Sequence, residues 1–116
     1  MSVQVKRVYD SPAKADGYRV LVDRLWPRGL KKSEARIDEW LKEIAPSTML
    51  RKRFKHDPDR WNEFKKKYSA ELDDHREQIE KLARDASKRT VTLLFAAKET
   101  EHNNAVALKE YIERLC

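Results

Sequence analysis

Two short polar segments of this sequence combine residue types that could bind an anion or move a proton. In the first, Asp23 to Gly29, Arg24 and Arg28 flank Trp26. Arginine presents a planar fork of donors that suits phosphate and carboxylate groups, and an indole offers a flat stacking surface. The turn at Pro27 to Gly29 could also direct backbone N–H groups toward an anion. The alternative interpretation is structural: an arginine–aspartate pair and a packed tryptophan that hold the loop.

The second segment runs from Lys98 to Asn104. His102 and Glu99 could serve as acid/base groups, and Lys98 and Asn103 could donate hydrogen bonds to a ligand. The segment opens the last predicted helix, and the N-terminus of a helix favours anions. The alternative is that Asn103 caps this helix while His102 lies on the surface without a function.

A third candidate region is Ser47 together with the basic runs that follow it. Ser47 could orient a ligand, although a serine at a helix start is first of all an N-cap. The bases in Arg51 to Lys55 and in Lys65 to Lys67 could bind the phosphates of a nucleic acid through the basic helices 48–55 and 58–70. A run of this kind is more often the solvated face of a helix.

Strands that would position these segments are predicted by hydrophobic patterning. Residues 2–9, 18–23 and 90–97 form short β-branched runs, and the last two are apolar enough to be covered on both faces. The short loop between the first two strands favours antiparallel pairing. The long connection from 18–23 to 90–97 favours a parallel crossover. Both polar segments would then lie at one sheet edge, so we expect a cleft at the C-terminal ends of strands 18–23 and 90–97.

Helices are predicted between and after these strands. Ile37 begins a set of apolar residues at i, i+3, i+4 and i+7, followed by Trp40, Leu41 and Ile44. This spacing predicts a helix that ends before Pro46. A short helix through Phe54 follows, and Asp57 with Pro58 signals the start of a long helix to about residue 86, with a bend near Asp73. A final helix closes the chain. The order β-β-α-α-α-β-α predicts a single α/β domain with a small, mostly parallel sheet and helices on both faces.

Composition restricts the class of protein. The chain has 116 residues with 26 basic and 20 acidic side chains, and its net charge of +6 favours phosphate-bearing partners. The single cysteine, Cys116, cannot form an intrachain disulfide, which fits a reducing compartment. The N-terminal residues lack the apolar region of a signal peptide, and no apolar run reaches membrane-spanning length. We therefore expect a basic, cytoplasmic protein that does not bind membranes.

Several common chemistries lack their motifs. The two glycines, Gly17 and Gly29, are too few for a dinucleotide fingerprint or a P-loop, and no G-x-S-x-G motif occurs. The three histidines lack metal-like spacing with one another or with Cys116. We expect neither a cofactor nor a metal site.

Four blocks in this order, YRVLVDRLWPRGL, DEWLKEIAPS, LRKRFKHDPDRWNEF and VTLLFAAKETEHNNAVALKEY, closely resemble the YeaO-like family (domain of unknown function 488). This bacterial family of small domains has no assigned function. The resemblance covers nearly the whole chain and implies an α/β sandwich of this size without supplying an activity. Arg53 departs from the family pattern, in which an aromatic is usual, and Lys98 occupies a variable position. The motif residues here are Asp23, Arg24, Trp26, Pro27, Arg28, Gly29, Pro46, Ser47, His56, Asp57, Pro58, Trp61, His102 and Asn103.

Three functions remain open at this stage. The first is a binding protein or enzyme for a small phosphate- or carboxylate-bearing ligand at the predicted sheet edge, where Arg24 and Arg28 would hold the anion and Trp26 would stack. The second is a nucleic-acid-binding protein that uses the basic helices. The third is a non-catalytic protein-interaction module that uses the long helix.

Overall fold

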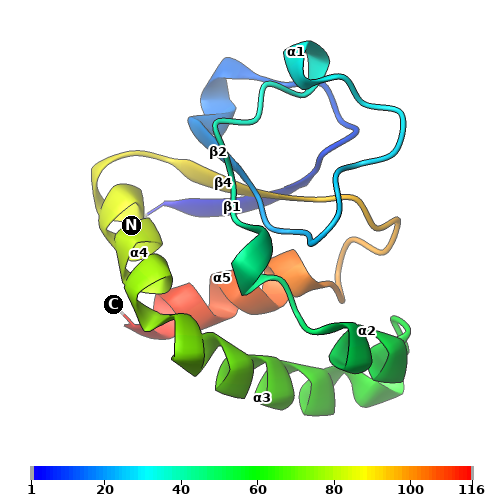
Figure 1. Cartoon of the computed structure of the whole chain (residues 1–116). Coiled ribbons are helices and arrows are strands. Elements are labelled where there is room, and N and C mark those ends of the chain that lie inside the picture. Colours follow the sequence, from blue (N-terminus) through cyan, green and yellow to red (C-terminus); the bar gives the residue numbers. More distant parts are fainter. Residues whose placement is uncertain (1, 116) are drawn as a thin grey trace.

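A four-stranded parallel sheet forms the centre of the computed structural model, which describes residues 2–115 (Figure 1). Its order is β1-β4-β2-β3, with β1 at Val3–Arg7, β2 at Tyr18–Leu21, β3 at Glu39–Trp40 and β4 at Val91–Phe95. All five residues of β4 are buried, because this strand has a neighbour on each side and side chains packed on each face. The predicted α/β fold with a parallel sheet is confirmed.

The predicted antiparallel pairing of the first two strands is wrong. β1 and β2 both pair with β4, and in parallel, so that Val3 and Tyr18 lie opposite Val91 on its two sides. Residues 8–17 return the chain to the starting end of the sheet and contain a short 3-10 helix, Lys14–Asp16. The most apolar strand takes an inner position in the sheet, where both of its faces and both of its edges are covered.

One face of the sheet is covered by the longer helices (Figure 1). These are α2 (Thr48–Phe54), α3 (Trp61–Leu72), α4 (Arg76–Lys88) and α5 (Asn104–Leu115). As predicted, Asp57 caps the turn in which Pro58 is the first residue, and the long helix bends at Asp73–His75. The buried stripe of α3 and α4 comprises Phe64, Tyr68, Leu72, Ile79 and Leu82.

The other face of the sheet is covered mainly by irregular chain. Its helical part is α1 (Lys32–Ala35), a single turn. A small apolar cluster forms beneath the segment 24–40 and consists of Val8, Leu21 and Leu94, with Trp26, Leu30, Ile37, Trp40 and Ala96 packed against it. Helical cover is therefore very unequal between the two faces.

The helix predicted from Ile37 to Ile44 is wrong. Residues 39–40 instead form β3 at the edge of the sheet, and a 3-10 turn, Lys42–Ile44, follows. The N–H of Leu41 also donates to the carbonyl of Leu21 at 2.9 Å. The exposed edge of β2 supplies backbone partners that outweigh helix formation over so short a segment. The apolar residues divide accordingly: Ile37 packs on the outer face, and Ile44 joins the core beneath the helices.

A buried ion pair fastens the irregular segment to the sheet. Arg19 of β2 is 4% exposed and pairs with Asp16, which is 5% exposed. The same guanidinium donates to the carbonyls of Ala35 at 2.9 Å and Arg36 at 3.1 Å. Lys6 adds a second ion pair to Asp16 at 3.1 Å. Because the groups are satisfied on every side, these charges can be buried.

Candidate functional site

Asp23 lies at the sheet edge where the C-terminal ends of β2 and β4 meet. Its Oδ2 accepts a hydrogen bond from the N–H of Ala96 at 2.9 Å, just beyond β4. Its Oδ1 accepts from the side-chain amide of Asn104, the first residue of α5, at 3.0 Å. That amide also donates to the carbonyl of Val22 at 3.0 Å. One carboxyl group thus joins the ends of two strands to the start of a helix.

The pKa of Asp23 is raised because burial penalises the carboxylate, and the hydrogen bonds from Ala96 and Asn104 only partly offset this cost. Two further groups, Arg51 and His56, lie close enough to favour the carboxylate through their charge. Arg51 belongs to α2 and His56 to the turn after it. The end of α2 is therefore brought to the sheet edge that carries Asp23.

The imidazole of His56, which lies near this carboxyl group, is bonded to the backbone of a second histidine, His102. Nδ1 of His56 lies 3.1 Å from the carbonyl oxygen of His102, and since a carbonyl only accepts, Nδ1 of His56 is the donor. Nδ1 of His102 lies 2.9 Å from a carboxylate oxygen of Glu99. With both Nδ1 atoms held, neither Nε2 atom hydrogen-bonds to any residue from 2 to 115. The Nε2 atoms are the polar groups available to a ligand.

Glu99 is fixed by the turn that carries His102. The N–H of Glu101 donates to it at 3.0 Å, and this bond, followed by the one from His102, lowers the pKa of Glu99. The ring of Trp61 meets the imidazole of His102 edge to face, with centroids 5.2 Å apart. Carboxylate and indole together hold the orientation of His102.

The backbone around His56 is strained. Lys55 and His56 both have positive φ, 49° and 54°, a region that costs a residue with a Cβ about 1 kcal/mol. The contact with the His102 carbonyl and the packing of the imidazole against Phe54, with centroids 5.4 Å apart, hold the turn in place. Strain of this kind concentrates at functional sites.

Two of the predicted ligand residues, Arg24 and Ser47, lie together in a different hollow. Arg24 donates to the carbonyls of Ala45 at 3.3 Å and Pro46 at 3.4 Å. Ser47 caps α2, and its hydroxyl donates to Glu71 at 2.7 Å. The hollow measures about 300 Å³ and carries three acidic groups, Glu43, Glu71 and Asp74, against Arg24 and His75. The excess of acid makes it unfavourable for an anion.

The other predicted residues divide between structural contacts and open surface. Trp26 donates to the carbonyl of Leu30 at 2.8 Å and meets Trp40 edge to face, with centroids 5.5 Å apart. Asn103 is fully buried and caps α5 by accepting from the N–H of Val106 at 3.0 Å. The side chains of Arg28 and Lys98 are exposed and form no ion pair with a residue between 2 and 115. Their predicted ligand roles stay predictions.

Within residues 2–115, no group of three or more His, Cys, Asp or Glu side chains is arranged to hold a metal ion. Over the same residues, no helix combines the length and the apolar character needed to cross a membrane.

Reasoning from the sequence missed the roles of Asp23, Arg51, His56 and Asn104 at this edge. A signal exists for Asp23, since it directly follows a buried strand. The pattern His56-Asp57-Pro58 predicts a helix start, but it does not indicate that the imidazole of His56 lies near Asp23. Asn104 is linked to Asp23 only through the fold.

The chain belongs to the family described as the inactive DUF488-N3 subclade, whose model matches residues 2–116. Among its relatives is the uncharacterised protein YeaO of Escherichia coli K12, which is 48% identical over 115 residues and covers 99% of this chain and 100% of its own length. The uncharacterised proteins Mb3100c of Mycobacterium bovis and Rv3073c of Mycobacterium tuberculosis are each 37% identical over 110 residues, or 95% of this chain and 92% of their own. No solved structure matches the chain. The resemblance to YeaO-like proteins is confirmed.

Proposed function

We propose that this chain is a non-catalytic binding domain for a small ligand that carries a phosphate or carboxylate group. The ligand lies at the C-terminal edge of β2 and β4. The observation that supports this proposal is that Arg51 and His56 lie near Asp23, which Asn104 also contacts, while the ring of His56 is bonded to the backbone of His102. The guanidinium of Arg51 is a suitable donor for an anion, the two Nε2 atoms donate to one when the imidazoles carry a second proton, and Trp61 supplies an adjoining flat apolar surface.

Binding without chemistry is favoured over catalysis by two considerations. The matching subclade is described as inactive. In addition, an acid/base pair such as Glu99 and His102 needs a reacting group within reach of the free Nε2. No serine or threonine hydroxyl among residues 2–115 hydrogen-bonds to Nε2 of either histidine, and the hydroxyl of Ser47 is held by Glu71.

The test is a thermal-shift screen with inorganic phosphate, nucleoside monophosphates and small dicarboxylates. We expect one of these classes to raise the melting temperature of the wild type and to raise that of Arg51→Gln much less. Lys52→Gln is the matched control, because Lys52 is an exposed cation on the same helix and forms no ion pair with the described residues. A shift that is equal in all three proteins, or no shift at all, would contradict the proposal.

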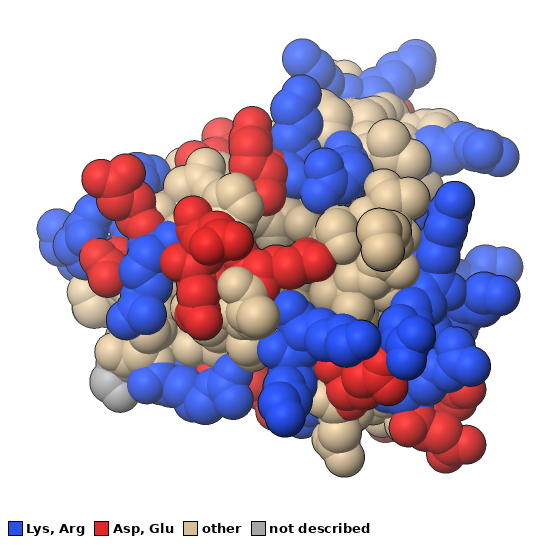
Figure 2. All heavy atoms as spheres, turned by 60° about the horizontal axis from the view of Figure 1, so that its bottom comes forward, with Lys and Arg blue, Asp and Glu red and all other residues tan. Residues whose placement is uncertain are grey.

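Nucleic-acid binding is a second candidate, favoured by the distribution of bases. Figure 2 shows Lys and Arg side chains gathered on the side of the molecule that carries α2 and the start of α3. Part of this charge is compensated, since Arg53 and Lys67 both pair with Glu63. Binding to single-stranded or duplex oligonucleotides should be detectable at low salt and weaken steeply as salt rises. Undetectable binding at low salt would exclude this candidate.

The aromatic residues of α3 do not support the protein-interaction hypothesis, which the length of the predicted helix motivates. Phe64 and Tyr68 are buried, and Trp61 is half-buried and packs against the same core. The aromatic stripe of α3 is occupied within the chain, so it offers no exposed apolar face to a partner.

A further inference from the structure

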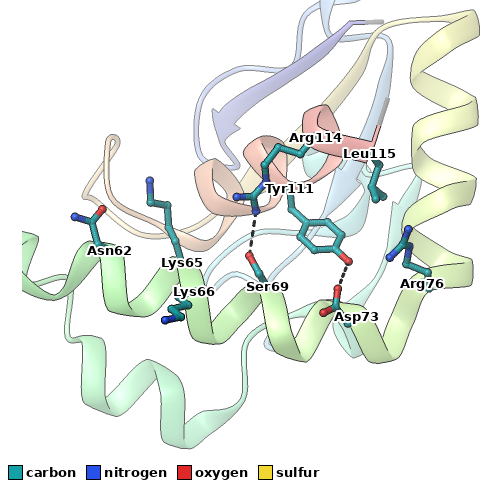
Figure 3. A pocket seen from close by; sticks show the side chains of 9 residues that line it. All are labelled: Asn62, Lys65, Lys66, Ser69, Asp73, Arg76, Tyr111, Arg114 and Leu115. Carbon is teal, nitrogen blue, oxygen red and sulfur yellow. Dashed lines mark hydrogen bonds between the residues drawn. The ribbon is translucent and has the colours of Figure 1, made fainter.

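A basic groove lies between α3 and the last turns of α5, lined also by Arg76 at the start of α4 (Figure 3). Its volume is about 520 Å³, within the range of small-molecule sites. None of Asp23, His56 and His102 contributes to it. The groove is lined by Asn62, Lys65, Lys66, Ser69, Asp73, Arg76, Tyr111, Arg114 and Leu115.

The α3 side of the groove follows from the helical repeat. Residues 62, 65, 66 and 69 recur at helical spacing on a face of α3 beside its core stripe, and residue 73 follows in the turn after the helix. That face is entirely polar, so this side of the groove offers charges and hydrogen-bonding groups to a ligand, while Tyr111 and Leu115 add apolar surface on the α5 side.

Four of the lining residues are cationic and one is acidic. The acid, Asp73, already accepts a hydrogen bond from the hydroxyl of Tyr111 at 2.6 Å, which Figure 3 shows on the floor of the groove. Burial and this hydrogen bond raise the pKa of Tyr111, so the hydroxyl stays protonated and continues to donate to Asp73. The groove therefore presents a strong excess of positive charge.

The cations are available to a ligand. Lys66 forms no ion pair with a residue between 2 and 115, and Arg114 donates only to the hydroxyl of Ser69, at 3.1 Å. Lys65 and Arg76 pair with Glu110 at 3.4 Å and with Glu80 at 3.5 Å. These pairs are solvent-exposed, and exposed ion pairs contribute little, so exchanging them for a ligand costs little.

The spacing of the cations decides which anion fits. Lys66 and Arg76 are ten residues apart along α3 and the turn after it, a distance of about 15 Å at the rise of an α-helix. A single phosphate or carboxylate cannot reach both ends of such a row. A chain of linked phosphates can contact more of the row, because it distributes several charges along its length and the long side chains of lysine and arginine extend toward it.

We propose that the groove between α3 and α5 is a binding site for a small polyphosphate, either inorganic or the phosphate chain of a nucleotide. Lys65 and Lys66 bind at one end, Arg76 binds at the other, and Arg114, which contacts Ser69, binds between them. This site is separate from the sheet-edge site and does not depend on it.

The test measures the dissociation constant of inorganic tripolyphosphate by calorimetry on the full chain. In Lys66→Gln/Arg114→Gln the dissociation constant should rise about tenfold or more, since each lost contact between a cation and a phosphate changes affinity several-fold. Lys31→Gln/Lys32→Gln is the matched control. It removes the same charge beside α1, on the far side of the sheet (Figure 1), and should leave the dissociation constant nearly unchanged.

An equal loss of affinity in both double variants would overturn the proposal, because net charge alone would then explain binding. Absence of binding to the wild type at low salt would overturn it as well. Binding of an oligonucleotide but not of tripolyphosphate or a nucleoside triphosphate would assign the groove to nucleic acid instead. Arg51→Gln should bind tripolyphosphate like the wild type, so failure of the sheet-edge site can be distinguished from failure of this one.

Discussion

Replacing Arg19 by methionine should destabilise the fold more than any exposed charge substitution. The change removes the guanidinium but fills most of its volume, and it leaves Asp16 buried without its nearest partner. It also deprives the carbonyls of Ala35 and Arg36 of their donors. Breaking a buried pair in this way costs about 3–5 kcal/mol. Lys6 still contacts Asp16 at 3.1 Å, so we expect a loss near 3 kcal/mol.

The assay is urea denaturation at neutral pH, analysed as a two-state transition. A loss near 3 kcal/mol corresponds to a fall of about 10–15 °C in melting temperature for a domain of this size. Arg53→Met is the matched control, because Arg53 also pairs with a carboxylate, that of Glu63, but both side chains are exposed, at 61% and 40%. The control should lose less than about 1 kcal/mol.

The double variant Asp16→Asn/Arg19→Met separates the ion pair from packing. Asparagine removes the unpaired charge, so the double variant should lose less free energy of unfolding than the sum of the two single variants, by about 1–3 kcal/mol. The pKa of Asp16 gives a further check. Burial raises it, but hydrogen bonds from Ala13, Lys6 and Arg19 outweigh burial and hold it below 3.8. The stability contributed by the wild-type carboxylate is therefore present above pH 3.8 and is lost as pH falls through the lower folded-state pKa.

A loss below 1 kcal/mol for Arg19→Met, or strict additivity in the double variant, would refute this reasoning. Either result would mean that packing of the outer segment, rather than the ion pair, fixes it to the sheet.

Three other substitutions have defined outcomes. Ser47→Ala removes the cap of α2 and a hydrogen bond to Glu71, and should cost about 1–2 kcal/mol by urea denaturation, whereas Thr48→Ala at an exposed position should not. Because the pKa of Asp23 is raised, its buried carboxylate destabilises the folded state as pH rises through the folded-state pKa. The difference in free energy of unfolding between Asp23→Asn and the wild type should therefore move in favour of Asp23→Asn between about pH 4 and pH 7. A pH-independent difference would contradict the raised pKa. Lys55→Gly relieves the positive φ of 49° and should keep or raise the melting temperature, unlike Lys55→Ala.

The parts of the fold that could be predicted from the sequence are those set by local patterns. The stripe of Phe64, Tyr68 and Leu72 predicts a buried helix face because helical spacing alone brings these side chains together. The bend near Asp73 and the start at Asp57-Pro58 are likewise local.

What could not be predicted depends on partners distant in the chain. The residues from Ile37 to Ile44 have helical spacing, yet the free edge of β2 captures their backbone. The pairing of β1 with β4 joins residues almost ninety positions apart, as in the bond between the N–H of Val8 and the carbonyl of Phe95 at 2.8 Å. A short loop between two strands favours antiparallel pairing only when no better neighbour exists, and the apolar β4 is such a neighbour.

The candidate site likewise has a part that local patterns predict and a part that depends on distant partners. The sheet edge could be predicted, since parallel strands that end in polar segments place those segments together. The residues with polar atoms left free at this edge could not be predicted, because residue type does not reveal which polar atoms the fold itself uses. Trp26 and Asn103 have suitable chemistry, but their donors and acceptors are engaged in holding a loop and a helix start.

The distinction between engaged and available polar atoms is the strongest argument for a binding site at the sheet edge. A turn whose only role is to connect α2 to α3 could adopt the same backbone without strain by carrying glycine at its positive-φ positions. This chain instead holds Lys55 and His56 in that region and presents the His56 imidazole beside Asp23, with its Nδ1 bonded to His102 and its Nε2 open. The cost of the turn is accounted for if the imidazole has a ligand. In that case His56→Gly, which removes the imidazole and the strain at position 56, should lose ligand binding, and the relief of strain should offset part of the stability lost with the contacts to His102 and Phe54.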